Sequence, residues 1–529
     1  MDIRSFLESR VARNPEKPFL FYEKEVLSFH EFDRRVNQAA NGLLEIGVER
    51  GDRFCLLLGN TPQFLYTWLG LAKIGAVMVA LNTSFREKEI GYIVNHCQAR
   101  GLITDSAHLT LVENLTPDCP SLQWSLCVDS VPDDFRVHSW LDLMKAMPGA
   151  LRGFDIIEED VAQIAYTSGT TGFPKGATHT HRNFVLTGEA FTLCADLGLE
   201  DRVMAIMPLF HTNAQYYSVM GALAASAGLI LIPRFSAGNF WVQAVEYQAT
   251  EFNFIGAIGN ILCRRPVSEF IPEHRIRTAY GAMVTPQVYD IFHNRFKIRN
   301  VIDGYGLTEV PRVCQNPIGG IIKMRSIGLP AKHPDRNLNF SQVKIIREDG
   351  QTATPGERGE ILVKSPVMMK GYYRDPEATS QAIEDGWFHT GDIGYKDSDG
   401  YIFFVDRKKN IIRRKGENVS AAEVETAINT HAAVADSAVI AVPSEMGEDE
   451  ILALIVLAPG ERLAPEEAID WLIPRLARFK LPRFIQFRES LPKTATARTA
   501  KYLLSNEEGL IEASFDMRPY LGESAVPKD

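Results

Sequence analysis

The chain has 529 residues, of which 45% are hydrophobic and 23% are charged, and its formal net charge is −10 at pH 7. A chain of this length predicts two or more domains, because single cores stop growing beyond about 250–300 residues. The negative balance argues against nucleic acid or an anionic membrane surface as the main partner, since both demand a basic surface.

Cysteine usage and hydropathy indicate the compartment. The seven cysteines are scattered, odd in number and free of Cys-x-x-Cys spacing, which is typical of a reducing compartment and not of a disulfide framework or a zinc site. The first residues lack the apolar core of a signal peptide. The two most apolar stretches, WLGLAKIGAVMVAL and VMGALAASAGLILIP, fall short of the roughly 20 residues of a membrane span. We therefore expect a cytoplasmic protein without an integral membrane segment.

The first 400 residues alternate short apolar runs with helical patterns. Residues 53–58 read as a strand, Asn60 or Thr61 can cap a helix that begins at Pro62 and ends near Ile74, and 76–81 read as the next strand. Similar units recur along the chain. Strands that alternate with helices predict an α/β fold with largely parallel sheets.

The stretch YTSGTTGFPKG, residues 166–176, concentrates three glycines, four Ser/Thr hydroxyls and Lys175. Glycines allow backbone N–H groups to turn inward and form a concave nest for an anion, and the hydroxyls and the lysine add donors and charge. The spacing differs from the Walker loop, and the flanking VAQIAYT and GATHTH both read as extended. A strand–loop–strand grip on a polyphosphate is the expected structure.

Two further stretches, YGAMV (280–284) and DGYGLTE (303–309), are glycine-broken ends of apolar strands, where open α/β sheets bind ligands. Tyr305 offers a flat face for a purine, Thr308 offers a hydroxyl for a phosphate, and Glu309 offers a hard oxygen for Mg²⁺. Taken alone, such a stretch is more often a turn.

From about residue 340 the pattern predicts antiparallel hairpins, and the last hundred residues read as a small α+β unit. Within the hairpins, GWFHTGD ends in Asp392, whose carboxylate can accept both hydroxyls of a ribose, and DRKKNIIRRKGEN carries Arg407. The structural alternatives are an Asp-anchored loop and a solvated basic face. The occurrence of all these stretches in this order favours a nucleotide site.

The ordered set resembles the adenylate-forming superfamily of acyl-CoA synthetases, luciferases and adenylation domains, nearest the carnitine/crotonobetaine-CoA ligase type. The resemblance covers nearly the whole chain. It implies a large AMP-binding domain over residues 1–406, with a β-barrel-like subdomain at about 340–405, a hinge at 407–409 centred on Lys409, and a small mobile α+β domain over 410–529.

Carried over by position, the resemblance implies an ATP-dependent acyl-CoA ligase that uses MgATP, a carboxylic acid and coenzyme A. Lys175, His211, Thr308, Glu309 and Arg498 would serve catalysis, with Glu309 also holding the metal. The nucleotide would be bound by Thr167, Ser168, Gly169, Thr170, Thr171, Gly172, Lys175, Gly281, Ala282, Met283, Asp303, Tyr305, Gly306, Thr308, Asp392 and Arg407.

The chain departs from the family pattern where a lysine of the small domain normally bridges the carboxylate and ATP. The stretch LPKTATARTAK places Arg498 there, and a second family lysine is Arg413. Arginine keeps the charge but has a different shape. Three alternatives follow. Arg498 would bind both the carboxylate and ATP, or Lys501 would take this role instead. In the third, adenylation would be impaired and the chain would be a nucleotide-binding regulator.

By the same resemblance, residues near His211, Asn213, Gln215, Tyr216, Tyr217, Val310 and Arg312 line the acid pocket. Their polarity favours a short or polar acid. Arg312 would pair with a second carboxylate of the substrate or form a structural salt bridge. The acceptor would be CoA or, alternatively, a separate carrier protein, since LGES (521–524) only faintly resembles a phosphopantetheine site. A homodimer is a further expectation.

Overall fold

The computed structural model describes the chain except residues 130–136, 146, 168–173, 415–416, 444–448, 494–498 and 522–529 and the side chains of 409, 417 and 418. Its residues form two compact units. The first comprises residues 1–344, 362–389 and 399–402, and the second comprises residues 345–361, 390–398 and 403–529. The predicted boundary at residues 406–407 stays a prediction.

A nine-stranded sheet of the first unit has the order β16-β15-β14-β13-β12-β10-β11-β1-β2. The strands from β14 to β1 are parallel, and β2, β15 and β16 add antiparallel edges. Their bounds are β1 (Pro18–Tyr22), β2 (Glu25–Ser28), β10 (Arg202–Ala205), β11 (Gly228–Leu231), β12 (Glu251–Ile255), β13 (Thr278–Ala282), β14 (Asn300–Tyr305), β15 (Cys314–Gln315) and β16 (Leu329–Pro330).

A seven-stranded sheet of the same unit has the order β7-β6-β5-β3-β4-β8-β9 and is parallel apart from β9. Its strands are β3 (Arg53–Leu57), β4 (Val77–Ala80), β5 (Gly101–Thr104), β6 (Trp124–Cys127), β7 (His138–Ser139), β8 (Val161–Thr167) and β9 (Lys175–Thr180). The strand and helix predicted at residues 53–74 are confirmed, and Thr61 is the residue that caps the helix.

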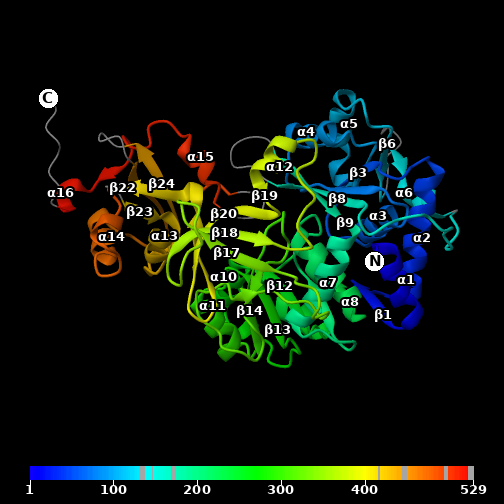
Figure 1. Ribbon diagram of the computed structural model, residues 1–529, viewed down its shortest axis with the longest axis horizontal. Helices are drawn as coiled ribbons and strands as arrows, with labels where there is room; N and C mark the ends of the chain where they lie inside the picture. The colour runs from blue at the N-terminus through cyan, green and yellow to red at the C-terminus, as the bar shows by residue number, and fades with distance from the viewer. Residues whose placement is uncertain are drawn as a thin grey trace. The chain divides into compact units, whose positions relative to one another are not determined.

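Helices cover both sheets of the first unit. They are α1 (Ile3–Arg13), α2 (Phe29–Glu45), α3 (Pro62–Lys73), α4 (Glu87–Cys97), α5 (Leu109–Leu115), α6 (Trp140–Lys145), α7 (His181–Ala195), α8 (Met220–Ala225), α9 (Phe240–Glu246), α10 (Gly256–Arg264), α11 (Pro286–Asp290) and α12 (Pro376–Ala382). Two π-helical segments span Ala214–Val219 and Ile291–Arg295. Figure 1 shows α7 beside α8, with which it is in contact.

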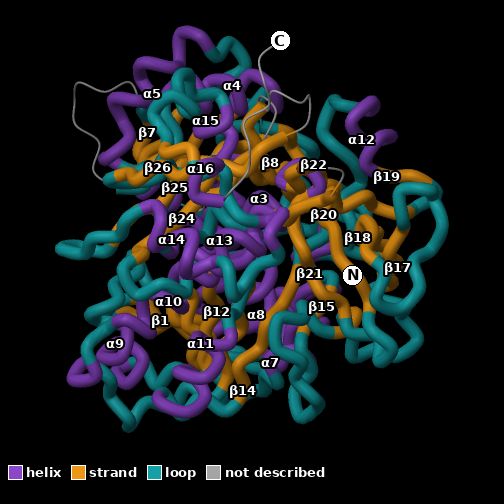
Figure 2. Tube along the Cα trace, turned by 90° about the vertical axis from the view of Figure 1, so that its left-hand side faces the viewer, coloured by secondary structure: helices purple, strands orange, loops and turns teal. Residues whose placement is uncertain are grey.

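The largest core joins side chains from both sheets to those of α1, α2, α3, α7 and α8. Alternation along the strands produces it: Phe54 and Leu56 of β3 enter this core, whereas Cys55 and Leu57 enter the core on the opposite face. The other face of the nine-stranded sheet packs against α9, α10 and α11, and Figure 2 shows α10 and α11 beside β12. Two-sided burial is typical of parallel sheets.

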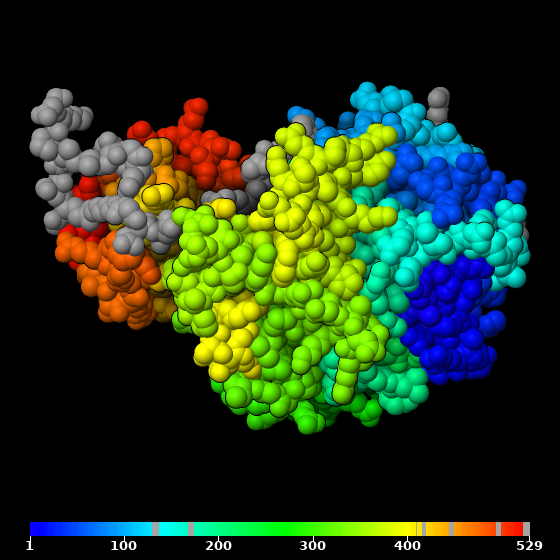
Figure 3. All heavy atoms as spheres, viewed as in Figure 1, coloured from blue at the N-terminus to red at the C-terminus, as the bar shows by residue number. Residues whose placement is uncertain are grey.

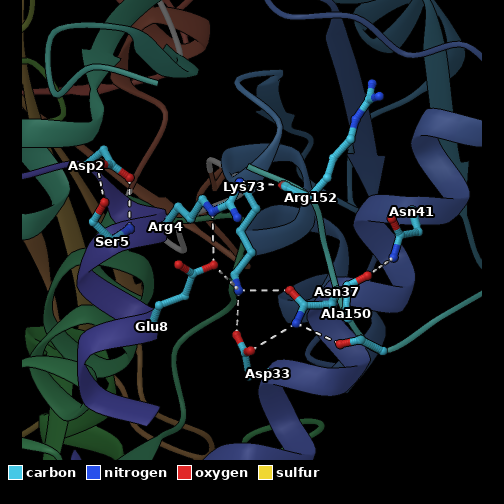
Figure 4. Close-up of polar contacts among 11 residues, drawn as sticks. Asp2, Arg4, Ser5, Glu8, Asp33, Asn37, Asn41, Lys73, Ala150 and Arg152 are labelled. Carbon is cyan, nitrogen blue, oxygen red and sulfur yellow. Dashed lines mark hydrogen bonds and ion pairs between the residues drawn. The ribbon is translucent and has the colours of Figure 1, made fainter. Parts of the chain in front are cut away.

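A buried cation ties three of these helices together (Figure 4). Lys73, at the end of α3, has a fully buried side chain, and its Nζ lies 2.6 Å from Asp33 Oδ1, 2.9 Å from Asn37 Oδ1 and 3.2 Å from Glu8 Oε1. Asp33 and Asn37 belong to α2 and Glu8 belongs to α1. The lysine that interrupts an apolar stretch in the sequence therefore has a structural role in the core.

The N-terminus lies against a later segment of the same unit. The amino group of Met1 is paired with Glu158, and Arg4 donates a hydrogen bond to the Arg152 carbonyl oxygen at 3.0 Å. Figure 3 shows the N-terminal residues, in dark blue, bordered by cyan atoms. The first helix is therefore fixed to the rest of the unit at its beginning.

The β-rich segment forms a five-stranded sheet of order β17-β18-β20-β19, with β21 paired to β20. These strands are β17 (Gln342–Ile346), β18 (Arg358–Lys364), β19 (Ile383–Glu384), β20 (Trp387–Lys396) and β21 (Ile402–Arg407).

In the second unit, a β22-β23 hairpin precedes a four-stranded sheet of order β24-β25-β26-β27. The remaining elements are β22 (Ile411–Arg414), β23 (Glu417–Ser420), α13 (Ala421–Asn429), β24 (Val434–Pro443), β25 (Asp449–Leu457), α14 (Pro465–Leu472), β26 (Phe484–Arg488), α15 (Lys501–Ser505), β27 (Phe515–Asp516) and α16 (Arg518–Leu521). The small α+β unit predicted for the last hundred residues is confirmed by these strands and helices.

All seven cysteines are free thiols. Among the helices that the structure describes, none is both long and apolar enough to cross a membrane.

Candidate active site

The predicted strand–loop–strand is present as the antiparallel pair β8 and β9. Thr167 pairs in register with Lys175, and its hydroxyl lies 3.4 Å from the Lys175 carbonyl oxygen. The paired strands therefore close the loop at these two residues. The predicted phosphate-binding residues Ser168, Gly169, Thr170, Thr171 and Gly172 lie outside the described residues.

Tyr372 connects Lys175 to Glu309. The Lys175 ammonium lies 5.3 Å from the centre of the Tyr372 ring, and the Tyr372 hydroxyl donates a hydrogen bond to Glu309 Oε1 at 2.9 Å. A cation over an aromatic face is held by the ring quadrupole. The two predicted catalytic residues, 134 positions apart in the sequence, are thus linked by one side chain that sequence reasoning missed.

The backbone around Tyr372 lies along β9. Ala177 and Tyr372 form an antiparallel bridge, Tyr373 N donates to Gly176 O at 2.7 Å, and Met369 N donates to Glu309 O at 2.8 Å. A hollow of about 670 Å³ opens here, lined by Thr178, Lys370, Gly371, Tyr372, Tyr373, Arg374, Asp375, Pro376, Thr379, Ser380 and Ile383. No motif marks Tyr372, because its role depends on a neighbour nearly 200 residues earlier in the chain.

The predicted nucleotide-binding residues Gly281, Ala282 and Met283 lie at the carboxyl end of β13, which runs parallel to β14 and pairs Gly281 with Asp303. Asp303 Oδ1 accepts a hydrogen bond from Val284 N at 3.1 Å. Burial raises the pKa of Asp303 to about 7, and backbone hydrogen bonds from the segment that includes Met283 oppose the rise. Asp303 thus fixes the segment Gly281–Met283, in which Met283 is 68% exposed.

The last residue of β14, Tyr305, and the residues after it form a tight loop that includes Gly306, Thr308 and Glu309. Leu307 N donates to Val310 O at 2.9 Å, and Val313 N donates to Tyr305 O at 3.0 Å. A Cβ at Gly306 would lie 2.2 Å from the Pro311 carbonyl oxygen, so only glycine fits without movement of the loop. Tyr305, Thr308 and Glu309 are half-buried and partly open to a ligand.

His179, on β9, supports this loop from inside. Its side chain is fully buried, its Nδ1 lies 3.0 Å from Asn183 Nδ2, and burial lowers its pKa to about 4, partly offset by a hydrogen bond with the Thr308 backbone. The sequence predicts only that residues 176–181, GATHTH, are extended. A buried neutral histidine therefore lies beneath this loop, close to the backbone of Thr308.

Residues predicted for the acid pocket follow β10. His211 and Asn213 are half-buried, and the π-helix Ala214–Val219 follows them. π-helical turns are rare and frequently occur at functional sites. Tyr216 is fully buried and stacks on Phe184 at a centroid distance of 4.2 Å, so its ring is part of the core. Val310 and Arg312 are also fully buried.

In the second unit, Asp392 and Arg407 form an ion pair, with 2.6 Å between Arg407 Nε and Asp392 Oδ1. Asp406 organises the segment of the predicted hinge: its Oδ2 accepts hydrogen bonds from Ser420 Oγ and Ala422 N, both at 2.8 Å, and its Oδ1 accepts one from Arg407 N at 2.7 Å. Lys409 lies in a 3₁₀ turn directly after Arg407. Asp406 is a further residue that sequence reasoning missed.

The positions that depart from the family pattern are described only in part. Arg498 lies outside the described residues. Arg413 is exposed on β22. Lys501 Nζ is 2.7 Å from Glu425 Oε1, and burial raises the pKa of Glu425, an effect that the lysine opposes. The alternative in which Lys501 takes over from Arg498 would therefore require this ion pair to break.

Comparison with known proteins identifies the family to which the chain belongs. The AMP-binding enzyme family matches residues 7–373, and the AMP-binding enzyme C-terminal domain matches residues 423–498. The crotonobetaine/carnitine–CoA ligase of Proteus mirabilis strain HI4320 is 34% identical over 485 residues, which are 90% of this chain and 92% of the relative. The same-named ligase of Escherichia coli O6:K15:H31 is 34% identical over 481 residues, 89% of this chain and 91% of the relative.

Solved structures agree with these relatives. An anthranilate CoA ligase in complex with anthranoyl-AMP has a TM-score of 0.86 at 26% identity and covers 95% of this chain and 96% of its own. ATP-bound MatB from Rhodopseudomonas palustris has a TM-score of 0.85 at 25% identity and covers 96% of this chain and 98% of its own. The chain therefore belongs to the AMP-binding enzyme family and is an AMP-forming acyl-CoA ligase.

Proposed function

We propose that this ligase activates a short or polar carboxylic acid with MgATP and transfers the acyl group to coenzyme A. In the first half-reaction a carboxylate oxygen attacks the α-phosphorus of ATP, the bond to the β-phosphate breaks, and pyrophosphate leaves. In the second, the CoA sulfur attacks the acyl carbonyl, the bond to AMP breaks, and the thiol proton passes to solvent. The contacts of Tyr372 with both Lys175 and Glu309 carry the proposal.

These contacts support the proposal because they bring one cation and one carboxylate to the same aromatic side chain. Little covalent work falls to the protein in phosphoryl and nucleotidyl transfer, so positioning and charge neutralisation supply most of the catalysis. Lys175 is exposed at the end of the β8–β9 loop, and its ammonium can meet the leaving pyrophosphate. Thr308 would contact the α-phosphate, and Tyr305 would stack on the adenine.

The residues present fit Mg²⁺ bound together with ATP. No cluster of three or more metal-ligating side chains occurs among the described residues, but Glu309 offers a partly open carboxylate. Mg²⁺ is usually held by one or two carboxylates together with substrate phosphates and waters. When bound, the ion would neutralise charge on the phosphates, and Tyr372 would fix the carboxylate that holds it.

The side chains predicted for the acid pocket favour a small polar substrate. His211 and Asn213 are polar, and the rings that follow them, Tyr216 and Tyr217, are packed in the core. A long aliphatic chain would require these rings to move. The curated relatives are named for crotonobetaine and carnitine, which are also short polar acids.

A panel of carboxylic acids with ATP, Mg²⁺ and CoA, read by AMP release and thioester formation, tests the proposal. We expect short polar acids to give AMP and acyl-CoA in equal amounts and long fatty acids to give neither. Replacing CoA by phosphopantetheinylated carrier proteins tests the alternative acceptor. Absence of acid-dependent pyrophosphate exchange with the whole panel would contradict the proposal and favour the regulator.

A further inference from the structure

Arg312 is a fully buried cation with no anionic partner among the described residues. Its side chain has no solvent exposure, and its guanidinium nitrogens have no carboxylate partner among the described residues; the polar group that acts on it most directly is the neutral Cys194 thiol. The alternative that Arg312 forms a structural salt bridge therefore lacks an Asp or Glu partner among the described residues. Buried guanidinium groups are normally paired, because removal of a charge from water is costly.

The groups that surround Arg312 are neutral. Its guanidinium carbon lies 5.7 Å from the centre of the Phe191 ring and 5.9 Å from that of Tyr280, and Cys194 and Tyr217 are its other neighbours. Burial raises the pKa of the Cys194 thiol to about 11 and that of Tyr217 to about 12, so both stay protonated at neutral pH. Aromatic faces offset only part of the cost of the buried charge.

The buried carboxyl group of Glu251 does not serve as the missing partner. Both of its oxygens lack hydrogen bonds among the described residues, and the charged groups that act on it are Asp201 and Arg277. Burial raises its pKa well above the ordinary value, which favours the uncharged acid. Among the described residues, Arg312 thus has no charged acid paired with it, although Glu251 also acts on Cys194.

The position of Arg312 relates it to the acid site. It comes three residues after Glu309, and the Tyr217 hydroxyl donates a hydrogen bond to the carbonyl oxygen of the adjacent Pro311. Tyr217 belongs to the π-helix that follows His211 and Asn213. The guanidinium therefore lies among side chains of α7, this π-helix and β13, and the π-helix directly follows the residues predicted for the acid pocket.

We propose that Arg312 is the receptor for a second anionic group on the substrate, so that the preferred acid is a short dicarboxylic acid. This inference rests on the proposed function. One carboxylate would be activated near Thr308, and the other would pair with the guanidinium, whose planar fork matches a carboxylate in two parallel hydrogen bonds. An acid with a distal quaternary ammonium, such as carnitine, would place like charges together.

The test compares acids of equal length that differ in one group. Acid-dependent pyrophosphate–ATP exchange is measured for succinate against butyrate, glutarate against pentanoate, and carnitine, with wild type and Arg312→Met, which retains length and loses the charge. Loss of a charge-assisted pair predicts a fall of about 10- to 100-fold in the ratio of kcat/KM for the diacid to kcat/KM for the monoacid. Arg312→Lys should restore part of the activity, because lysine lacks the fork.

Arg299→Met, at an exposed arginine, is the matched control and should keep the wild-type preference. If Arg312→Met is unstable, the Tm of the wild type is measured instead with each member of an acid pair. The diacid is expected to raise the Tm more than the monoacid of equal length. Equal activity of wild type on the diacid and the monoacid, or an unchanged ratio in Arg312→Met, would overturn this inference while the ligase activity stands. Absence of exchange with every acid would instead overturn the proposed function, and this inference with it.

Discussion

The link from Tyr372 to Glu309 yields a sharp prediction, because Tyr372→Phe removes one oxygen and leaves the ring. The variant loses the 2.9 Å hydrogen bond to Glu309 Oε1, whereas the ring that lies 5.3 Å from the Lys175 ammonium remains. A hydrogen bond to a charged group contributes about 1.5–3 kcal/mol. Since both side chains are half-buried, the lower end applies, and kcat/KM for MgATP should fall about tenfold.

Pyrophosphate exchange at varied MgATP and saturating acid measures this effect. Tyr372→Leu also removes the ring and should cost a further two- to fivefold, from about 0.5–1 kcal/mol of cation–π attraction. A double-mutant cycle with Glu309→Gln isolates the hydroxyl–carboxylate pair, with an expected coupling of about 1 kcal/mol. Tyr247→Phe, which removes a hydroxyl bonded to the Glu23 carbonyl oxygen at 3.0 Å, is the control. An unchanged kcat/KM in Tyr372→Phe, or strict additivity in the cycle, would refute the reasoning.

The remaining predictions concern stability. Burial lowers the pKa of His181 to about 4, so the unfolded chain takes up the proton first as the pH falls below about 6.5. Between pH 7 and pH 5 the free energy of unfolding should therefore fall by about 2 kcal/mol on account of this residue. In urea unfolding, His181→Gln should lose about 2 kcal/mol less than the wild type over the same pH range. Asp303 acts with the opposite sign, because its pKa of about 7 in the folded chain favours folding at low pH. From pH 5 to pH 8 the free energy of unfolding of the wild type, measured in urea, should fall by about 3 kcal/mol more than that of Asp303→Asn. Lys73→Met leaves Asp33 without its buried cation and should lower the free energy of unfolding by about 3 kcal/mol. The double variant Lys73→Met with Asp33→Leu should lose less, because no charge is then left unpaired. Equal losses in the single and double variants would contradict the ion-pair role.

Local signals in the sequence predicted the parts of the fold that neighbouring residues determine. Thr61 before Pro62 specifies a helix start, and the extended runs VAQIAYT and GATHTH on either side of residues 168–173 specify the β8–β9 pair, because capping and alternation act over a few residues. The same holds for the strand ends that carry Gly281 and Asp303. These positions depend on backbone geometry that short segments encode.

Contacts between distant segments could not be predicted in this way. Nothing adjacent to Tyr372 in the chain indicates that its hydroxyl meets Glu309, and nothing near His179 indicates that it lies close to the backbone of Thr308. Lys73 reads as a break in an apolar run, yet its partners on α1 and α2 make it part of the core. In each case the chemistry of the residue depends on which element the fold packs against it.

Transfer of a labelled oxygen tests the central claim most directly, because adenylation joins a carboxylate oxygen of the acid to the α-phosphorus. An acid labelled with ¹⁸O in its carboxylate is converted to the thioester, and the released nucleotide is analysed by mass spectrometry. The account predicts one ¹⁸O in each AMP and none in pyrophosphate. Unlabelled AMP, or formation of ADP with the label in phosphate, would show that the acid is activated by another route and would contradict the account.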